Sequence, residues 1–143
     1  MVDIVKLCVG CDSVAALRRA LRQEWNECAE EGPFRIWAHT RNGPKRADDI
    51  LASGGSLYWV IQGVIACRQR ITGFDFTRRE TGEPLCRIGL DLTVVPTAPW
   101  PMRAFQGWRY LPEDRRPPDA PDWIGDDAPP PEMERELRAL GLI

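Results

Sequence analysis

The stretch SLYWVIQG at residues 56–63, followed directly by VIACRQRI at residues 64–71, decides the fold. Both segments are rich in β-branched and aromatic residues, which are typical of β-strands. Gly63 stands between them, where a glycine often forms a bulge or a tight corner. The pair therefore predicts two strands that meet at a sharp corner, as in a small barrel.

Upstream of this pair the sequence predicts a strand and an amphipathic helix. Residues 4–9 are apolar and β-branched and end at Gly10, as a short strand would. Asp12 or Ser13 is expected to cap the following helix, which Gly32 and Pro33 terminate. Apolar residues recur along this helix at helical spacing and predict a buried stripe. The stripe consists of Val14, Leu17, Leu21, Trp25 and Cys28.

A second strand and a short helix are expected before residue 56. Residues 34–40 alternate in the manner of a strand. Asn42, Gly43 and Pro44 predict a turn, and Pro44 suits the first position of a short helix over residues 45–52.

Downstream, the extended pattern continues to Phe76, and a further strand is expected over residues 85–95 after a turn at residues 81–84. Residues 96–101 are interrupted by prolines and predict a loop. Residues 117–131 contain six prolines and four aspartates and predict an arm without regular structure. A last helix is expected over residues 132–143.

These elements predict an α+β fold: a small mixed or antiparallel β-barrel with flanking helices. The 143 residues fit a single domain, with a body over residues 1–116, the arm and the final helix. No apolar run approaches the ~18 residues of a membrane span. The first residues lack the features of a signal peptide, so a cytoplasmic location is expected.

The five cysteines are odd in number and are expected to be reduced in the cytoplasm. Cys8 and Cys11 form a C-x-x-C pair before a helix, which suggests redox chemistry or half of a metal site. A zinc site would need a second ligand pair at similar spacing, and none is present. We therefore favour buried small side chains and expect no metal or other cofactor.

Charge is distributed unevenly along the chain. Residues 35–116 carry thirteen basic and eight acidic side chains, a net charge of +5, whereas residues 117–143 carry two basic and seven acidic, a net charge of −5. This predicts a basic body with an acidic tail that either folds over the basic face or stays solvated.

The turn after the second strand is a candidate anion site. Arg41, Lys45 and Arg46 surround a turn and a helix N-terminus, whose free N–H groups attract anions. Lysine provides a point charge and arginine a fork that fits phosphate. A solvated turn is the alternative reading.

Arg68 and Arg70 lie on one side of a strand and would repel each other unless an anion or a carboxylate lies nearby. Asp48 or Asp49 could be that carboxylate, which is the structural alternative to ligand binding.

Residues 103–111 combine rings and positive charges. Phe105 and Trp108 could stack on unpaired bases, Arg103 and Arg109 could hold phosphates, and Gln106 could read a base edge. About half of such rings are expected in the core.

Catalysis finds little support, because the sequence contains no glycine-rich phosphate loop and no Ser/His/Asp signature. His39, the single histidine, is a weak candidate for a general base.

Several strings in the sequence resemble the bacterial domain-of-unknown-function family fourteen-eighty-nine. They are HTR at 39–41, PKR at 44–46, GGSLYWVI at 54–61, Gly63, RQR at 68–70 and FQGWRYL at 105–111. The family implies no established activity. Gln62 departs from the lysine expected there, which removes one positive charge beside the candidate face.

A weaker, fold-level resemblance is to PUA-like domains, including the ASCH group, and it implies binding of RNA or modified bases. The leading hypothesis is therefore a non-catalytic domain that binds single-stranded RNA or a nucleotide. The alternatives are an enzyme acting on a nucleotide or a small phosphorylated compound, and a protein-interaction module that uses the arm.

Overall fold

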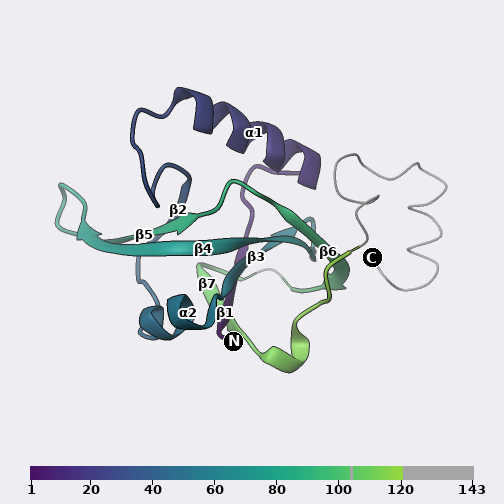
Figure 1. The fold of residues 1–143 in the computed structure, drawn as a ribbon. Coiled ribbons are helices and arrows are strands. Elements are labelled where there is room, and N and C mark those ends of the chain that lie inside the picture. Colours follow the sequence, from purple (N-terminus) through teal and green to yellow (C-terminus); the bar gives the residue numbers. More distant parts are fainter. Residues whose placement is uncertain (104, 121–143) are drawn as a thin grey trace.

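A seven-stranded sheet with two α-helices forms the described part of the chain, which is residues 1–103 and 105–120 of this computed structural model (Figure 1). In chain order the elements are β1 (Asp3–Leu7), α1 (Val14–Glu27), β2 (Trp37–Thr40), α2 (Ala47–Ser53), β3 (Ser56–Ile61), β4 (Val64–Arg78), β5 (Pro84–Leu90), β6 (Val95–Pro101), β7 (Trp108–Leu111) and the 3-10 turn η1 (Glu113–Arg115). The strands lie in the order β2-β5-β4-β3-β1-β7, and β6 pairs with β4 outside this path. The α+β class is confirmed.

The hairpin of β3 and β4 is the element that the sequence predicts best. Gln62 and Gly63 connect the strands, and both have positive φ angles, 49° and 81°. Two such residues form the backbone of a type I′ turn, whose twist matches that of a hairpin. Ile61 pairs with Val64 directly beside the turn, so the tight corner predicted at Gly63 is confirmed.

Strand β4 joins the two halves of the sheet. It runs for 15 residues, pairing first with β3 on one edge and β6 on the other, and from Ile71 onward with β5. Its register shifts once against each of these neighbours, and such irregularities bend a strand. One end of β4 therefore lies under α1 and the other extends toward the turn before β5 (Figure 1).

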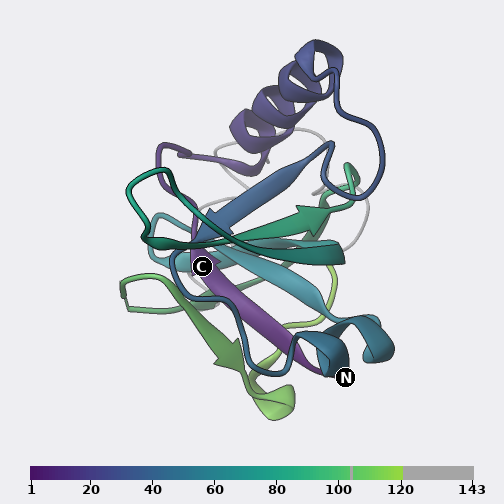
Figure 2. The same ribbon diagram turned by 90° about the vertical axis from the view of Figure 1, so that its left-hand side faces the viewer.

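Helix α1 covers one face of the sheet (Figures 1 and 2). The Ser13 hydroxyl accepts a hydrogen bond from the Ala16 amide at 3.0 Å and caps the helix. Leu17 and Leu21 are buried in the main core, which also contains Ile4 of β1 and Leu57 of β3. The predicted stripe is confirmed at these positions, and Cys28 lies one residue beyond the helix as its C-cap.

The face opposite α1 has a smaller core of its own. Because successive side chains of a strand point to opposite faces, Ile4 and Leu57 pack toward α1 while Val5 and Tyr58 pack away from it. The members of the smaller core are Val5, Tyr58, Val60, Ile65, Phe105 and Leu111. The middle of the sheet is thus buried on both sides.

The sheet is open, so the predicted closed barrel is wrong. Its end strands β2 and β7 form no ladder with each other in the described residues. The loop after β2 meets β7 through side chains instead, since the Trp108 indole donates to the Asn42 carbonyl and the Tyr110 hydroxyl accepts from the Arg46 amide. This loop occupies the place where backbone pairing would have to close a barrel.

Two further predictions are corrected at the prolines. The strand expected over residues 85–95 ends at Leu90, and residues 96–101 form most of strand β6 instead of a loop. Proline lacks the amide proton that a central strand needs, but it is tolerated on an edge strand. Among the named strands, β6 pairs with β4 alone.

The beginning of the arm lies along β6. The Ala98 amide donates to the Pro118 carbonyl, and the Ala120 amide donates to the Pro96 carbonyl, both at 2.8 Å. The rest of the arm and the helix predicted over residues 132–143 lie outside the described residues. Within the described part, no helix combines the length and the apolar character needed to cross a membrane.

Candidate ligand-binding site

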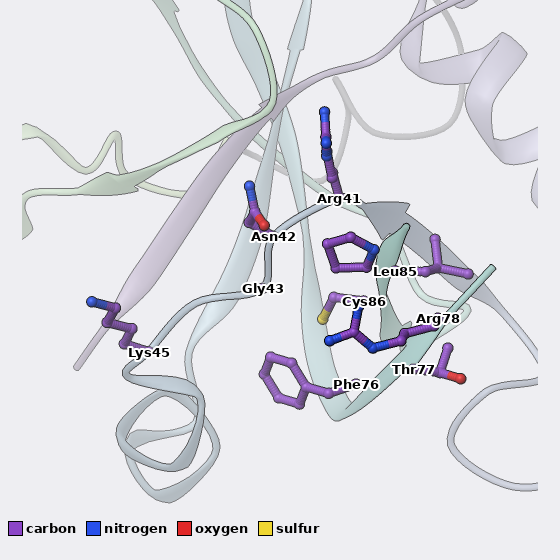
Figure 3. A pocket seen from close by; sticks show the side chains of 10 residues that line it. Arg41, Asn42, Gly43, Lys45, Phe76, Thr77, Arg78, Leu85 and Cys86 are labelled. Carbon is purple, nitrogen blue, oxygen red and sulfur yellow. The ribbon is translucent and has the colours of Figure 1, made fainter. Parts of the chain in front are cut away.

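A pocket of about 810 Å³ lies between the loop after β2 and the hairpin of β4 and β5 (Figure 3). The β2 loop forms one wall, and the end of β4 with the start of β5 forms the other. The lining residues are Arg41, Asn42, Gly43, Lys45, Phe76, Thr77, Arg78, Pro84, Leu85 and Cys86. The pocket therefore combines backbone of a turn with positive charges and a ring.

Three cationic side chains border this pocket. Arg41 and Lys45 are exposed, and neither forms an ion pair with a carboxylate of residues 1–103 or 105–120. Arg78 donates to the Gly82 carbonyl at 3.0 Å and reaches across the pocket toward Phe76 and Cys86 (Figure 3). An anion in the pocket would meet a positive field that no described acidic side chain neutralises by direct contact.

Phe76 provides the ring. It is 59% exposed and lies in a stacked arrangement on Phe74, with ring centroids 6.4 Å apart. A large apolar side chain exposed on a strand is costly in water, because its surface remains hydrated. Its exposure inside a basic pocket leaves a flat surface on which another planar group could stack.

Gly43 allows the β2 loop to lie against this ring. A Cβ atom at this position would overlap Cε1 of Phe76 and would come within 2.7 Å of Sγ of Cys86. Only a residue without a side chain lets the backbone approach the ring this closely. The next residue, Pro44, is fully buried and anchors the loop.

Two side chains of strand β7 form hydrogen bonds to the β2 loop. The indole of Trp108 donates to the Asn42 carbonyl at 2.5 Å. Its ring lies edge to face with the ring of Tyr110, and the ring centroids are 4.8 Å apart. The Tyr110 hydroxyl accepts from the Arg46 amide at 3.2 Å. Both rings thus hold the loop that presents Arg41 and Lys45.

The remaining charged candidates lie apart from the pocket. The Arg46 guanidinium forms an ion pair with Asp49 of α2 at 3.1 Å, and Arg68 forms one with Asp119 at 2.8 Å. Arg70 is exposed on β4 beyond the pocket. Asp119, and not the Asp48 or Asp49 considered from the sequence, therefore neutralises Arg68.

The candidates between residues 103 and 109 divide into core and surface. Phe105 is only 8% exposed and belongs to the smaller core, so its ring is not presented to a ligand. The guanidinium of Arg109 lies over that ring, with Cζ 4.8 Å from the ring centroid. Arg103 and Gln106 are exposed, but neither lines the pocket.

His39 is exposed on β2, opposite Arg87 of β5, and does not line the pocket. Partial burial and the charges of Arg79 and Lys6 lower its pKa, so the ring is neutral near pH 7. Burial and the nearby Asp75 raise the pKa of the Cys86 thiol to about 11, which keeps it protonated and weakly nucleophilic. Among the described residues, no three His, Cys, Asp or Glu side chains are grouped to hold a metal ion.

Sequence reasoning missed Phe76, Thr77 and Arg78. All three end a strand whose pattern was visible only as far as Phe76. The available signal was an aromatic residue followed two positions later by two arginines, just before the turn at residues 81–84. That the β2 loop packs on this strand end is a tertiary contact, which the sequence pattern does not show.

Comparison with known proteins identifies a family. Over residues 4–143 the chain matches the family described as "Protein of unknown function (DUF1489)". No curated protein and no solved structure matches the chain, so the fold-level likeness to PUA-like domains is not confirmed. The match spans almost the whole sequence and includes the strings that first suggested this family. The chain belongs to the DUF1489 family.

Proposed function

We propose that this protein binds single-stranded RNA or a free nucleotide, with one nucleotide unit in the pocket between the β2 loop and the hairpin of β4 and β5. The observation that carries the proposal is that Arg41, Lys45 and Arg78 line the same pocket as the exposed ring of Phe76. Phosphate and a flat base are the two groups that this combination suits best.

Each side chain would act through ordinary recognition chemistry. Arg41 would hold a phosphate with its fork, and Lys45 would add a flexible point charge. A base would stack on Phe76, which is worth about 1–3 kcal/mol per base in single-strand binders. The volume of about 810 Å³ falls in the range of roughly 300–1,000 Å³ that is typical of small-molecule sites.

The test is to replace two cations of the pocket, Arg41→Ala with Lys45→Ala, and to measure binding of a fluorescent hexameric RNA and of AMP. We expect at least a ten-fold loss of affinity for both. Because each phosphate contact to a single strand contributes about 0.7 to the salt slope, that slope should fall by roughly 1.4 for the RNA.

The matched control is Arg19→Ala with Arg22→Ala. These arginines are exposed on α1, so the control changes the net charge equally at a distance from the pocket. Equal losses in the two double variants, or binding that does not depend on salt, would contradict the proposal.

A further inference from the structure

A second polar cluster lies on the sheet face opposite α1, beside the smaller core. Tyr58 pairs with Arg68, and Arg68 pairs with Val95 of β6. Thr97, two residues further along β6, forms an isolated bridge with Asp119. Since paired residues of neighbouring strands point to the same face, the side chains of Tyr58, Arg68, Thr97 and Asp119 share this face.

Arg68 and Asp119 are joined by two parallel hydrogen bonds, the arrangement by which an arginine binds a carboxylate ligand. The guanidinium donates through Nε to Oδ1 and through Nη2 to Oδ2, both at 2.8 Å. Its remaining nitrogen, Nη1, donates to the Ser56 hydroxyl at 3.1 Å. Two parallel bonds of this kind are the strongest form of arginine–carboxylate pairing, and Arg68 accordingly lowers the pKa of Asp119.

The other charges of the cluster are already matched. Asp3 is buried and accepts from the Ser56 amide at 2.8 Å and from Arg116 at 3.2 Å. Within residues 1–103 and 105–120, Asp119 is the one carboxylate that forms an ion pair with Arg68. If Asp119 left, Arg68 would lose its counter-ion in a half-buried place.

The backbone around Asp119 joins β6 through an isolated β-bridge. Pro118 accepts from the Ala98 amide, and Ala120 donates to the Pro96 carbonyl. Figure 1 shows this segment rising from η1 to the side of β6. Addition of an extended segment to a sheet edge, with one side chain as an anchor, is a common way to bind peptides.

The hydroxyl of Thr97, on β6 beside Asp119, forms no hydrogen bond within the described residues. It is buried, with the residue only 2% exposed. Buried polar groups are normally paired. A slightly different strand on β6 could therefore make a contact that residues 118–120 leave unmade.

We propose that the edge of β6, with Arg68, Ser56 and Thr97, is a binding site for an extended peptide that carries an aspartate, and that residues 118–120 of this chain occupy it as an internal ligand. The occupant in trans is a peptide of the same chemistry, an aspartate preceded by proline, which favours the extended backbone. Because the internal segment is tethered, its effective concentration is high and the site is closed in the native chain. This site does not depend on the pocket at the β2 loop.

The experiment uses the full chain and a synthetic peptide with the sequence of residues 116–120, RPPDA, blocked at both ends. Binding is followed by NMR through the amide of Ala98 in the native protein and in Asp119→Ala. We expect the variant to bind the peptide at least ten-fold more tightly than the native protein, because its Arg68 fork is free.

Two controls identify the anchor. A peptide with asparagine in place of the aspartate should bind Asp119→Ala at least ten-fold more weakly, and so should the aspartate peptide when Arg68→Ala is added. Equal affinity of the native protein and Asp119→Ala, or no binding to a folded Asp119→Ala, would overturn the proposal.

If Asp119→Ala does not fold, Ala120→Pro replaces it, since this change removes the amide that donates to Pro96 and keeps the Asp119 carboxylate. It should bind the peptide at least three-fold more tightly than the native protein, and an unchanged affinity would overturn the proposal. Tighter binding of RNA without tighter binding of peptide would assign Arg68 to phosphate and would also overturn it. Neither result bears on AMP binding at the pocket.

Discussion

Gly43 shows how one residue without a side chain determines the shape of the pocket. Its backbone lies against Phe76 and Cys86 so closely that a methyl group would overlap both. The alternation of residues on β4 and the turn residues at 42–44 were evident from the sequence, but their contact joins residues more than thirty positions apart. A local pattern carries no information about such a contact, and for this reason Arg41 was predicted as a site residue while Phe76 was not.

We predict that Gly43→Ala destabilises the protein by about 1–3 kcal/mol, as overpacking of a close contact does. It should also weaken binding of AMP. Urea unfolding measures the first effect and a fluorescence titration the second.

The control for this substitution is Gly43→Ala combined with Phe76→Ala. Removal of the ring should relieve part of the overlap, so the double variant should be less destabilised than the sum of the two single variants. Strict additivity would show that the contact between Gly43 and Phe76 is not the source of the strain.

Among the elements, strand β7 holds the β2 loop in place. The sequence predicted ligand-binding rings and charges over residues 103–111. In the structure Phe105 fills the smaller core, and Trp108 and Tyr110 hold the β2 loop. A segment rich in rings and positive charges has the same composition whether its rings stack on a ligand or support a neighbouring loop. The difference depends on which strand lies beside β7, and the parallel pairing of β1 with β3 that places it there was not visible in the pattern.

We predict that Trp108→Phe lowers the free energy of unfolding by about 1 kcal/mol through the lost hydrogen bond to the Asn42 carbonyl. It should also weaken nucleotide binding, although Trp108 does not line the pocket. Urea unfolding and AMP titration are the measurements.

Tyr110→Phe is the companion variant, because it removes only the hydroxyl that accepts from the Arg46 amide. It should act in the same direction on both quantities. Normal affinity in both variants would show that the loop holds its position without β7.

For strand β6 the sequence pattern led to a wrong prediction. Pro96, Pro99 and Pro101 favoured a loop, yet the segment pairs with β4 along one edge. Proline excludes a segment from the middle of a sheet but not from its edge. Which strand would be an edge follows from the order of the whole sheet. The α1 stripe and the β3–β4 hairpin depend on no such order, and both were predicted.

At the scale of the molecule, β4 carries both the pocket, which lies at its end, and Arg70, which is exposed near its middle. Arg70 precedes Phe76 by six residues, which corresponds to about 20 Å along a strand at ~3.3 Å per residue. One nucleotide is too short to contact both, whereas a strand of RNA is not. The basic stretch predicted as one face therefore consists of a pocket and separate charges along β4.

We predict that Arg70→Ala lowers the affinity for a twelve-nucleotide RNA at least three-fold and leaves the affinity for AMP unchanged. Arg68→Ala is the matched control on the same strand, and it should change neither, since Asp119 already neutralises that guanidinium. Loss of AMP binding in Arg70→Ala would place Arg70 at the pocket and contradict the separation of the two regions.

The position of β1 between β3 and β7 has a consequence for synthesis of the chain. β1 can pair with β3 once residue 61 has been made, but its other edge stays open until β7 is complete at residue 111. At ~5–20 residues per second, the intervening fifty residues take roughly 3–10 s to translate. During that interval an unpaired edge of DIVKL is exposed, and such edges are prone to pair with other chains. The nascent protein thus carries an open edge at β1 until its seventh strand has left the ribosome.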